Sequence, residues 1–302
     1  MGMISISDAW PSDAIEKHKS YVYQVIDSAL AAEPALGGVT RAFIRSHRHD
    51  IAHGRPAALR RVIGCAEILK CALSVAAYEK FAEDCKKIFN YESFSRAKPP
   101  KWGAYALCSA SKYSMCPYCH QSFAHTLVPD GYGAFRPTLD HYYPKARYPY
   151  LGLSVFNLVP SCYTCNSQLK GVKNFYEEVH AHPLEDTADE IEFVFDLSAY
   201  IEARRRGGSE YQLKVRGRSD AAAMSVSTFA LDRRFAINGA YLDSFIARAL
   251  DYINGAAARS RINPALRFGL KEADVIGFDA ENYKNEMLGK IKLDLYGIVL
   301  AR

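Results

Sequence analysis

Two closely spaced pairs of cysteines carry the clearest chemical signal in the sequence. They are Cys116-Pro-Tyr-Cys119 and Cys162-Tyr-Thr-Cys165. A Cys-x-x-Cys pair directs two thiolates at one point, and two such pairs supply the four tetrahedral sulfur ligands of a structural Zn²⁺ site. A redox site of the thioredoxin type needs a single pair in a β-α-β unit, so two matched pairs favour zinc. We therefore expect these four cysteines to bind a structural zinc ion.

The segment between the two pairs contains residues suited to hydrolytic chemistry, Asp140 and His141, followed by Pro144. A carboxylate is a hard oxygen ligand for Mg²⁺ or a similar cation. An imidazole with its usual pKa of about 6.5 is largely neutral at cytoplasmic pH and can act as a general base. Neighbouring residues of a strand point to opposite faces, so these two can serve one target only where the strand ends. Pro144 provides such an end.

A third candidate, Asn166, directly follows the second cysteine pair. It lies in a predicted short helix, Tyr163 to Lys170, which ends at Gly171. Its carboxamide oxygen is a second hard ligand. Zinc at the start of this helix would fix the helix relative to the Asp-His strand. His120 follows the first pair and is predicted to be a turn residue in the left-handed conformation.

In this order, the segments resemble the HNH endonucleases of the His-Me finger, or ββα-metal, superfamily. The resemblance covers about residues 116–171: a Cys-x-Tyr-Cys pair, Asp-His before a proline, Asn-Leu-Val, and Cys-x-x-Cys-Asn-x-x-x-Lys. By this resemblance, His141 is the general base, and Asp140 and Asn166 hold a catalytic Mg²⁺ or Mn²⁺ ion. Asn157 holds the loop that positions the histidine. The four cysteines match the zinc knuckles of many members.

One stretch after the Asp-His pair departs from the common family pattern. Many members have two glycines shortly after Asp-His-x-x-Pro, whereas Lys145 to Leu151 contains none. The version in this chain, Asp-His-Tyr-Tyr-Pro-Lys-Ala-Arg-Tyr-Pro, resembles a subgroup that includes the HNH subunit of the Septu antiphage system. This narrower resemblance implies a role in antiviral defence and a partner ATPase.

The family resemblance implies hydrolysis of phosphodiester bonds, with DNA favoured over RNA as the substrate. A neutral His141 would take a proton from the attacking water, and the products would carry a 5′-phosphate and a 3′-hydroxyl. Four cations flank the site and are candidates to bind phosphates or to form a solvated rim: Lys145, Arg147, Lys170 and Lys173. The alternative function is a zinc-stabilised nucleic-acid-binding module without catalysis. The presence of Asp140, His141 and Asn166 favours the endonuclease.

The composition is that of a folded protein, with 302 residues, 49% hydrophobic and 24% charged. These values exclude disorder and coiled coil as the main architecture. The net charge is +5, and residues 102–175 carry six Lys or Arg against two Asp or Glu, which is compatible with a local polyanion site. No apolar segment reaches the ~20 residues of a membrane span, and the N-terminal residues contain no apolar signal sequence. We therefore expect a cytoplasmic protein.

The predicted fold is α+β and mostly helical, with a central zinc-stabilised ββα-metal core. The expected regions are an N-terminal helical region (1–101), a zinc-knuckle HNH nuclease core (102–175), and a C-terminal region with a short β-hairpin and helices (176–302). Hydrophobic periodicity predicts helices over 11–32, 57–90, 219–256 and 280–299, and strands over Ile191–Leu197 and Tyr211–Val215. Arg204 to Gly208 is expected to be a turn, and His180 and His182 are expected at the surface.

Overall fold

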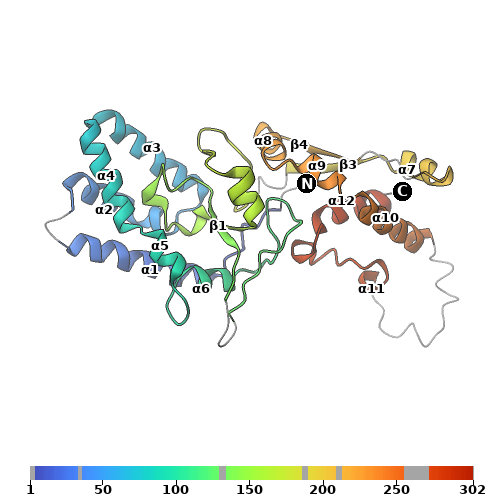
Figure 1. The fold of residues 1–302 in the computed structure, drawn as a ribbon, viewed down its shortest axis with the longest axis horizontal. Helices are drawn as coiled ribbons and strands as arrows, with labels where there is room; N and C mark the ends of the chain where they lie inside the picture. The colour runs from blue at the N-terminus through green and yellow to red at the C-terminus, as the bar shows by residue number, and fades with distance from the viewer. Residues whose placement is uncertain are drawn as a thin grey trace.

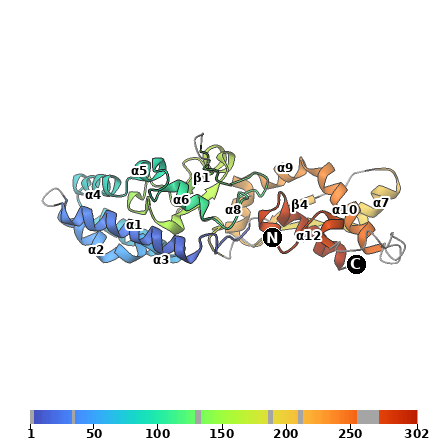
Figure 2. The same cartoon turned by 90° about the horizontal axis from the view of Figure 1, so that it is seen from below.

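The computed structural model describes residues 4–32, 36–128, 134–185, 190–208, 213–254 and 272–301. The chain is elongated, with the N-terminal helices at one end, residues 102–175 in the middle and the C-terminal elements at the other end (Figure 1). The turned view shows the same order along the long axis (Figure 2). Within these ranges helices dominate and two sheets of two strands each are present, which confirms the expected mostly helical α+β class. None of the described helices combines the length and apolar character needed to cross a bilayer.

Five helices form the N-terminal end of the molecule. They are α1 (Ser12–Ala31), α2 (Gly38–His53), α3 (Pro56–Ala72), α4 (Val75–Ile88) and α5 (Tyr91–Arg96). The helix predicted over 11–32 is confirmed as α1. The helix predicted over 57–90 is instead two helices, because the chain turns at Leu73 and the Ser74 side chain accepts a hydrogen bond from the backbone of Ala77. A serine in this position satisfies a free N–H group at a helix start.

The middle of the chain contains a small sheet and the short helices around it. The elements are α6 (Ala104–Ser109), β1 (Thr138–His141), η1 (Pro149–Leu151), η2 (Val155–Asn157), β2 (Leu158–Ser161) and the π-helical η3 (Thr164–Lys170). β1 pairs with β2 in antiparallel register, with His141 opposite Leu158. β1 also ends at His141, as the sequence predicts. The last helical segment, η3, lies in contact with β1.

The N-terminal helices hold the long connection between β1 and β2. Tyr150 of η1 is fully buried, and its ring contacts those of Phe43 on α2 and Phe81 on α4 at 5.2 and 6.1 Å. The buried ring of His18 on α1 donates from Nε2 to the carbonyl oxygen of Leu153 at 2.7 Å. The helical end of the molecule therefore fixes the backbone of the loop that follows the Asp-His strand.

The C-terminal end combines a second two-stranded sheet with helices. Its elements are β3 (Ile191–Phe195), α7 (Leu197–Arg205), β4 (Leu213–Gly217), α8 (Asp220–Thr228), α9 (Leu231–Ala236), α10 (Gly239–Asn254), α11 (Glu272–Ile276), η7 (Tyr283–Asn285) and α12 (Gly289–Leu300). β3 and β4 pair antiparallel. Both predicted strands are present, although Tyr211 and Gln212 lie outside the described residues. The turn expected over Arg204 to Gly208 is present at Arg206 and Gly207, but it begins two residues later than predicted because α7 extends to Arg205.

The C-terminal helices are shorter than the periodicity predicts. The segment 219–256 contains three helices, α8, α9 and α10, separated first at Ala230, whose φ is +47°. This left-handed residue ends one helix and starts the next. The preceding residue, Phe229, is buried and stacks on Tyr118 with ring centroids 4.5 Å apart. Of the helix predicted over 280–299, only the part from Gly289 onward is α-helical. At Ala230 the break in the periodic pattern therefore accompanies packing of the preceding residue against the centre of the molecule.

Candidate metal centre and active site

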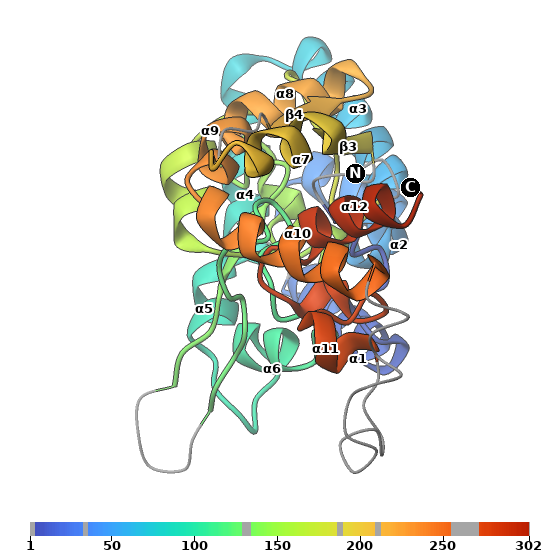
Figure 3. The same ribbon diagram turned by 90° about the vertical axis from the view of Figure 1, so that its right-hand side faces the viewer.

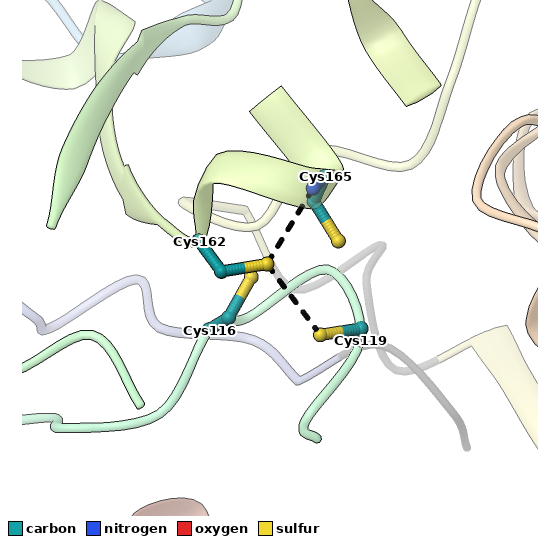
Figure 4. A group of neighbouring side chains, drawn as sticks. All are labelled: Cys116, Cys119, Cys162 and Cys165. Carbon is teal, nitrogen blue, oxygen red and sulfur yellow. Dashed lines mark hydrogen bonds between the residues drawn. The ribbon is translucent and has the colours of Figure 1, made fainter. Parts of the chain in front are cut away.

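The four paired cysteines meet at one point, which lies between the segment that follows α6 and the start of η3 (Figure 4). Their sulfur atoms all lie within 4.8 Å of one another, and the Sγ atoms of Cys119 and Cys162 are 4.0 Å apart. Zn–S bonds of about 2.3 Å in a tetrahedron place the sulfurs about 3.8 Å apart. The backbone N–H of Cys165 points at Cys162 Sγ at 3.4 Å. The group therefore has the ligands and spacing to hold one metal ion such as zinc.

His120 closes the turn of the first cysteine pair. Its φ is +54°, which confirms the predicted left-handed conformation, and its N–H donates to the carbonyl of Cys116 at 2.8 Å. Its buried ring accepts a hydrogen bond at Nδ1 from the backbone of Lys290 and donates from Nε2 to the carbonyl of Lys284. Burial lowers the pKa of His120 to about 4, so the ring is neutral and can both donate and accept. The turn thereby anchors the start of α12, a contact that the sequence did not predict.

Arg234 on α9 supplies a positive charge beside the sulfur cluster. Its Nη1 atom donates to Cys165 Sγ at 3.2 Å. Four thiolates and one Zn²⁺ leave a net charge of −2, so a guanidinium at this distance offsets part of that charge. The sequence offered no signal for this contact, because Arg234 lies 69 residues beyond the cysteine.

His141 lies at the end of β1 with its ring almost entirely buried. Its Nε2 atom is 3.0 Å from the carbonyl oxygen of Gly152, and the ring of Tyr91 on α5 meets it edge-on at 4.4 Å. Because a carbonyl oxygen only accepts, Nε2 carries the hydrogen and the neutral ring keeps its lone pair on Nδ1. Burial lowers the pKa of His141 to about 3, which keeps the imidazole neutral. The geometry therefore presents Nδ1 as a proton acceptor.

Asn157, at the end of η2, ties together the two ends of the loop after β1. Its Oδ1 atom accepts from the backbone N–H of Tyr143 at 2.7 Å, and its Nδ2 atom donates to the carbonyls of Tyr143 and Leu151 at 3.0 and 3.1 Å. The side chain is fully buried. Since Gly152 directly follows Leu151, these bonds position the carbonyl that orients the His141 ring.

Asp140 is also buried, and both of its carboxylate oxygens accept hydrogen bonds from side chains. Oδ1 is 2.6 Å from Nζ of Lys170, and Oδ2 is 2.6 Å from the hydroxyl of Tyr118. Lys170 also donates to the backbone carbonyl of His141. Burial raises the pKa of the Tyr118 hydroxyl, so this group remains a donor. Sequence reasoning missed Tyr118 as a partner of Asp140.

Lys170 differs from the other three predicted phosphate ligands. Its side chain is buried, whereas Lys145, Arg147 and Lys173 are exposed around the site. In η3 the backbone N–H of Gly171 donates to the carbonyl of Asn166, five residues earlier, as in a π-helix. Among the hydrogen bonds of the described residues, Lys170 is the η3 residue that reaches Asp140, while Tyr118 reaches its other oxygen.

Asp140 and Asn166 carry the donor types of a hard-cation site, a carboxylate and an amide oxygen. A positive charge already occupies part of this candidate cation site, because the ammonium of Lys170 pairs with Asp140. A divalent cation can bind Asp140 closely only after Lys170 has moved away from it. The donor chemistry therefore fits, and Lys170 competes for the same carboxylate.

The expectation that His180 and His182 lie at the surface is wrong. Both are buried, His180 stacked on Phe175 and His182 stacked on Tyr142, each with ring centroids 3.7 Å apart. Burial lowers the pKa of both rings. They form part of the aromatic packing behind β1. An adjacent acidic stretch in the sequence had suggested exposure, but the aromatic partner of His182, Tyr142, is distant in the chain.

Comparisons of the chain with protein-family models, with curated proteins and with solved structures found no match. What bears on function is the set of residues in the chain itself. Those residues comprise four converging thiols, a neutral histidine at a strand end, and an asparagine that fastens the loop beside it.

Proposed function

We propose that the chain is a zinc-stabilised, metal-dependent HNH endonuclease, in which residues 116–171 form a ββα-metal core. One observation carries the proposal. The Nε2–H of His141 is fixed by the carbonyl of Gly152, which leaves Nδ1 as the acceptor, and the ring stands at the end of the β1 strand that contacts η3. η3 begins at the cysteine cluster. A base with one defined lone pair at a strand end is suited to activating water.

In the proposed reaction, Nδ1 of His141 accepts a proton from a water molecule in line with the scissile phosphodiester bond. Asn157 keeps the loop in place and Gly152 keeps the imidazole oriented. Asp140 and Asn166 would hold a Mg²⁺ or Mn²⁺ ion, which when bound neutralises charge on the phosphate and on the departing 3′ oxygen. The exposed cations Lys145, Arg147 and Lys173 bind flanking phosphates. DNA is the favoured substrate.

Replacement of the proposed base tests this function. His141→Ala should abolish cleavage of plasmid and oligonucleotide substrates in Mg²⁺ or Mn²⁺, while leaving the zinc content and the circular dichroism spectrum unchanged. His49→Ala, at an exposed histidine on α2, is the matched control and should cut normally. Retained cutting by His141→Ala above trace level contradicts the proposal. Tight binding without cleavage, by the native chain in either ion, identifies the alternative, a zinc-stabilised binding module.

The resemblance to the Septu HNH subunit supports a further part of the proposal, a partner ATPase and a role in antiphage defence. Such a partner would control when the nuclease acts. Purification of a tagged chain from its native operon tests this point. Recovery of an ATPase at equal stoichiometry is the expected result, and recovery of the chain alone contradicts it.

A further inference from the structure

An extended arm with an exposed aromatic face projects next to the candidate active site. We define the aromatic arm as residues 122–128 and 134–137, which follow the first cysteine pair and lead into β1. Its two segments pair through hydrogen bonds in both directions between Leu127 and Phe135, at 2.9 and 3.0 Å. The arm lies beside α5 and α6 (green in Figure 3). The two segments are therefore joined at one isolated β-bridge.

One face of the aromatic arm is apolar and open to solvent. Alternate residues of an extended chain share a face, so Phe123, His125 and Leu127 point the same way. Phe123 is 62% exposed, Leu127 49% and Phe135, opposite Leu127, 47%. The ring of His125 stands between those of Phe123 and Phe135, with centroids 5.5 and 5.3 Å away. On the other face, Ala124 is buried. Exposed apolar clusters of this kind mark binding surfaces.

A basic loop lies at the base of the arm. The side chains of Arg96, at the end of α5, and of Lys98 and Lys101, between α5 and α6, are exposed. The arm is fastened to α5 by Arg136, whose Nη2 atom donates to Ser95 Oγ at 2.6 Å. The surface of the arm thus combines flat aromatic rings with positive charge, which complements a chain of bases and phosphates.

The same helix connects this surface with the proposed base. α5 carries Tyr91, whose ring contacts His141 at 4.4 Å. The chain itself also connects the two. Phe135 precedes His141 by six residues, and six extended residues span at most about 20 Å. A strand of nucleic acid with its bases on the arm would therefore be within a few nucleotides of Nδ1 of His141.

We propose that the aromatic arm binds the unpaired bases of single-stranded nucleic acid, with the adjacent phosphates on the basic loop. Every base has a π-face that stacks on an aromatic ring, whereas the bases of a duplex are already stacked on one another. The link between this binding and cleavage rests on the proposed function. It assigns unpaired or locally opened strands as the substrate class. The binding itself can be measured without cleavage.

The test uses the full-length, zinc-loaded chain with His141→Ala, without added Mg²⁺ or Mn²⁺. Fluorescence anisotropy measures binding to labelled oligothymidine, oligouridine and a duplex of equal length, and the first two probes distinguish DNA from RNA. Phe123→Ala with Phe135→Ala should raise the Kd for single strands roughly 5-fold to 150-fold for each lost stacked base. Phe123→Trp should retain tight binding. Ile68→Ala with Val75→Ala removes apolar side chains that are more exposed than the two phenylalanines from the N-terminal helices and should leave the Kd unchanged.

Three results overturn the inference. They are an unchanged Kd in the double phenylalanine variant, absence of single-strand binding by the parent, and a change of oligomeric state in light scattering instead of a change in Kd. The last result assigns the arm to a protein contact. Cleavage is scored separately in the chain with His141 intact. Single-strand binding without cleavage contradicts the proposed function and supports the binding role of the aromatic arm. Cleavage by a chain whose single-strand binding is unchanged by the phenylalanine substitutions supports the proposed function and contradicts the role of the arm.

Discussion

Nζ of Lys170 lies 2.6 Å from Oδ1 of Asp140, and both side chains are almost completely removed from solvent. In this arrangement the carboxylate expected to hold a divalent cation is paired with an ammonium group. Burial lowers the pKa of Lys170, while the charge of Asp140 acts in the opposite direction. Lys170 thus stabilises the buried carboxylate and at the same time opposes close approach of a second cation.

Removal of this positive charge should strengthen cation binding. Lys170→Gln is expected to bind Mn²⁺ at least about tenfold more tightly, because a unit charge a few ångströms from the ion is repulsive even at a high effective dielectric constant. The amount of free Mn²⁺ can be measured by electron paramagnetic resonance. Lys173→Gln, at an exposed lysine of the same segment, is the control. Equal affinities for all three proteins would show that Lys170 does not compete with the ion.

The hydrogen bond from Arg234 to Cys165 should slow the loss of zinc. We expect one zinc ion per chain in the native protein, measured by mass spectrometry. Arg234→Met should speed transfer of zinc to a chromogenic chelator by about 10-fold or more, as is usual when a partner of a metal ligand is removed. Arg233→Met changes the exposed neighbouring arginine and should behave like the native chain. Identical release rates would assign Arg234 to helix packing alone.

Asn157→Asp should damage both stability and cleavage, although the side chain keeps its shape. An aspartate accepts from Tyr143 as before, but it cannot donate to the carbonyls of Tyr143 and Leu151. Leaving buried groups unpaired costs about 1–3 kcal/mol each, and displacing the loop beside His141 should slow cleavage about a hundredfold. Urea unfolding and single-turnover kinetics measure the two effects. Asn282→Asp, at an exposed site, provides the comparison, and normal cleavage by Asn157→Asp would refute the loop's role.

The features that follow from short-range spacing were predictable. The turn of each cysteine pair, the left-handed His120, the end of β1 at His141 and the length of α1 each depend on residues close together in the chain, and the matching spacing of the two pairs predicts that they share one ion. A Cys-x-x-Cys turn, a proline after a strand and an apolar helical stripe constrain local geometry directly. For this reason the arrangement of the proposed metal centre is readable from the sequence.

The features that depend on long-range packing were not predictable. The burial of Lys170 requires Asp140 and Tyr118 from two other segments, and the break at Ala230 accompanies the burial of Phe229 against Tyr118. Lysine side chains are usually exposed, so the presence of a lysine at the end of η3 gave no indication that it would be buried. Similarly, the link from His120 to α12 spans about 170 residues. Such contacts set the electrostatics of the site without leaving a local pattern.

The contact between His18 and Leu153 predicts how stability depends on pH. Nε2 of His18 donates to the carbonyl of Leu153, while Nδ1 accepts from Trp102, so the buried ring must be neutral. Burial lowers the pKa of His18 to about 4, against about 6.5 in the unfolded chain. The unfolded state therefore binds more protons as the pH falls. The stabilisation is complete above pH 6.5, declines between pH 6.5 and 4, and its loss amounts to about 3 kcal/mol.

His18→Phe should lower the free energy of unfolding at pH 7, because the bond to Leu153 is lost, but should flatten its decline toward pH 4.5. Urea unfolding followed by tryptophan fluorescence measures this, since Trp102 adjoins the ring. The other buried histidines titrate in both proteins and cancel in the difference. His49→Ala should retain the native slope. Parallel curves for His18→Phe and the native chain would show that His18 is not held neutral. Leu153 directly follows Gly152, whose carbonyl orients His141. Slower cleavage by His18→Phe would therefore show that α1 also helps to position the proposed base.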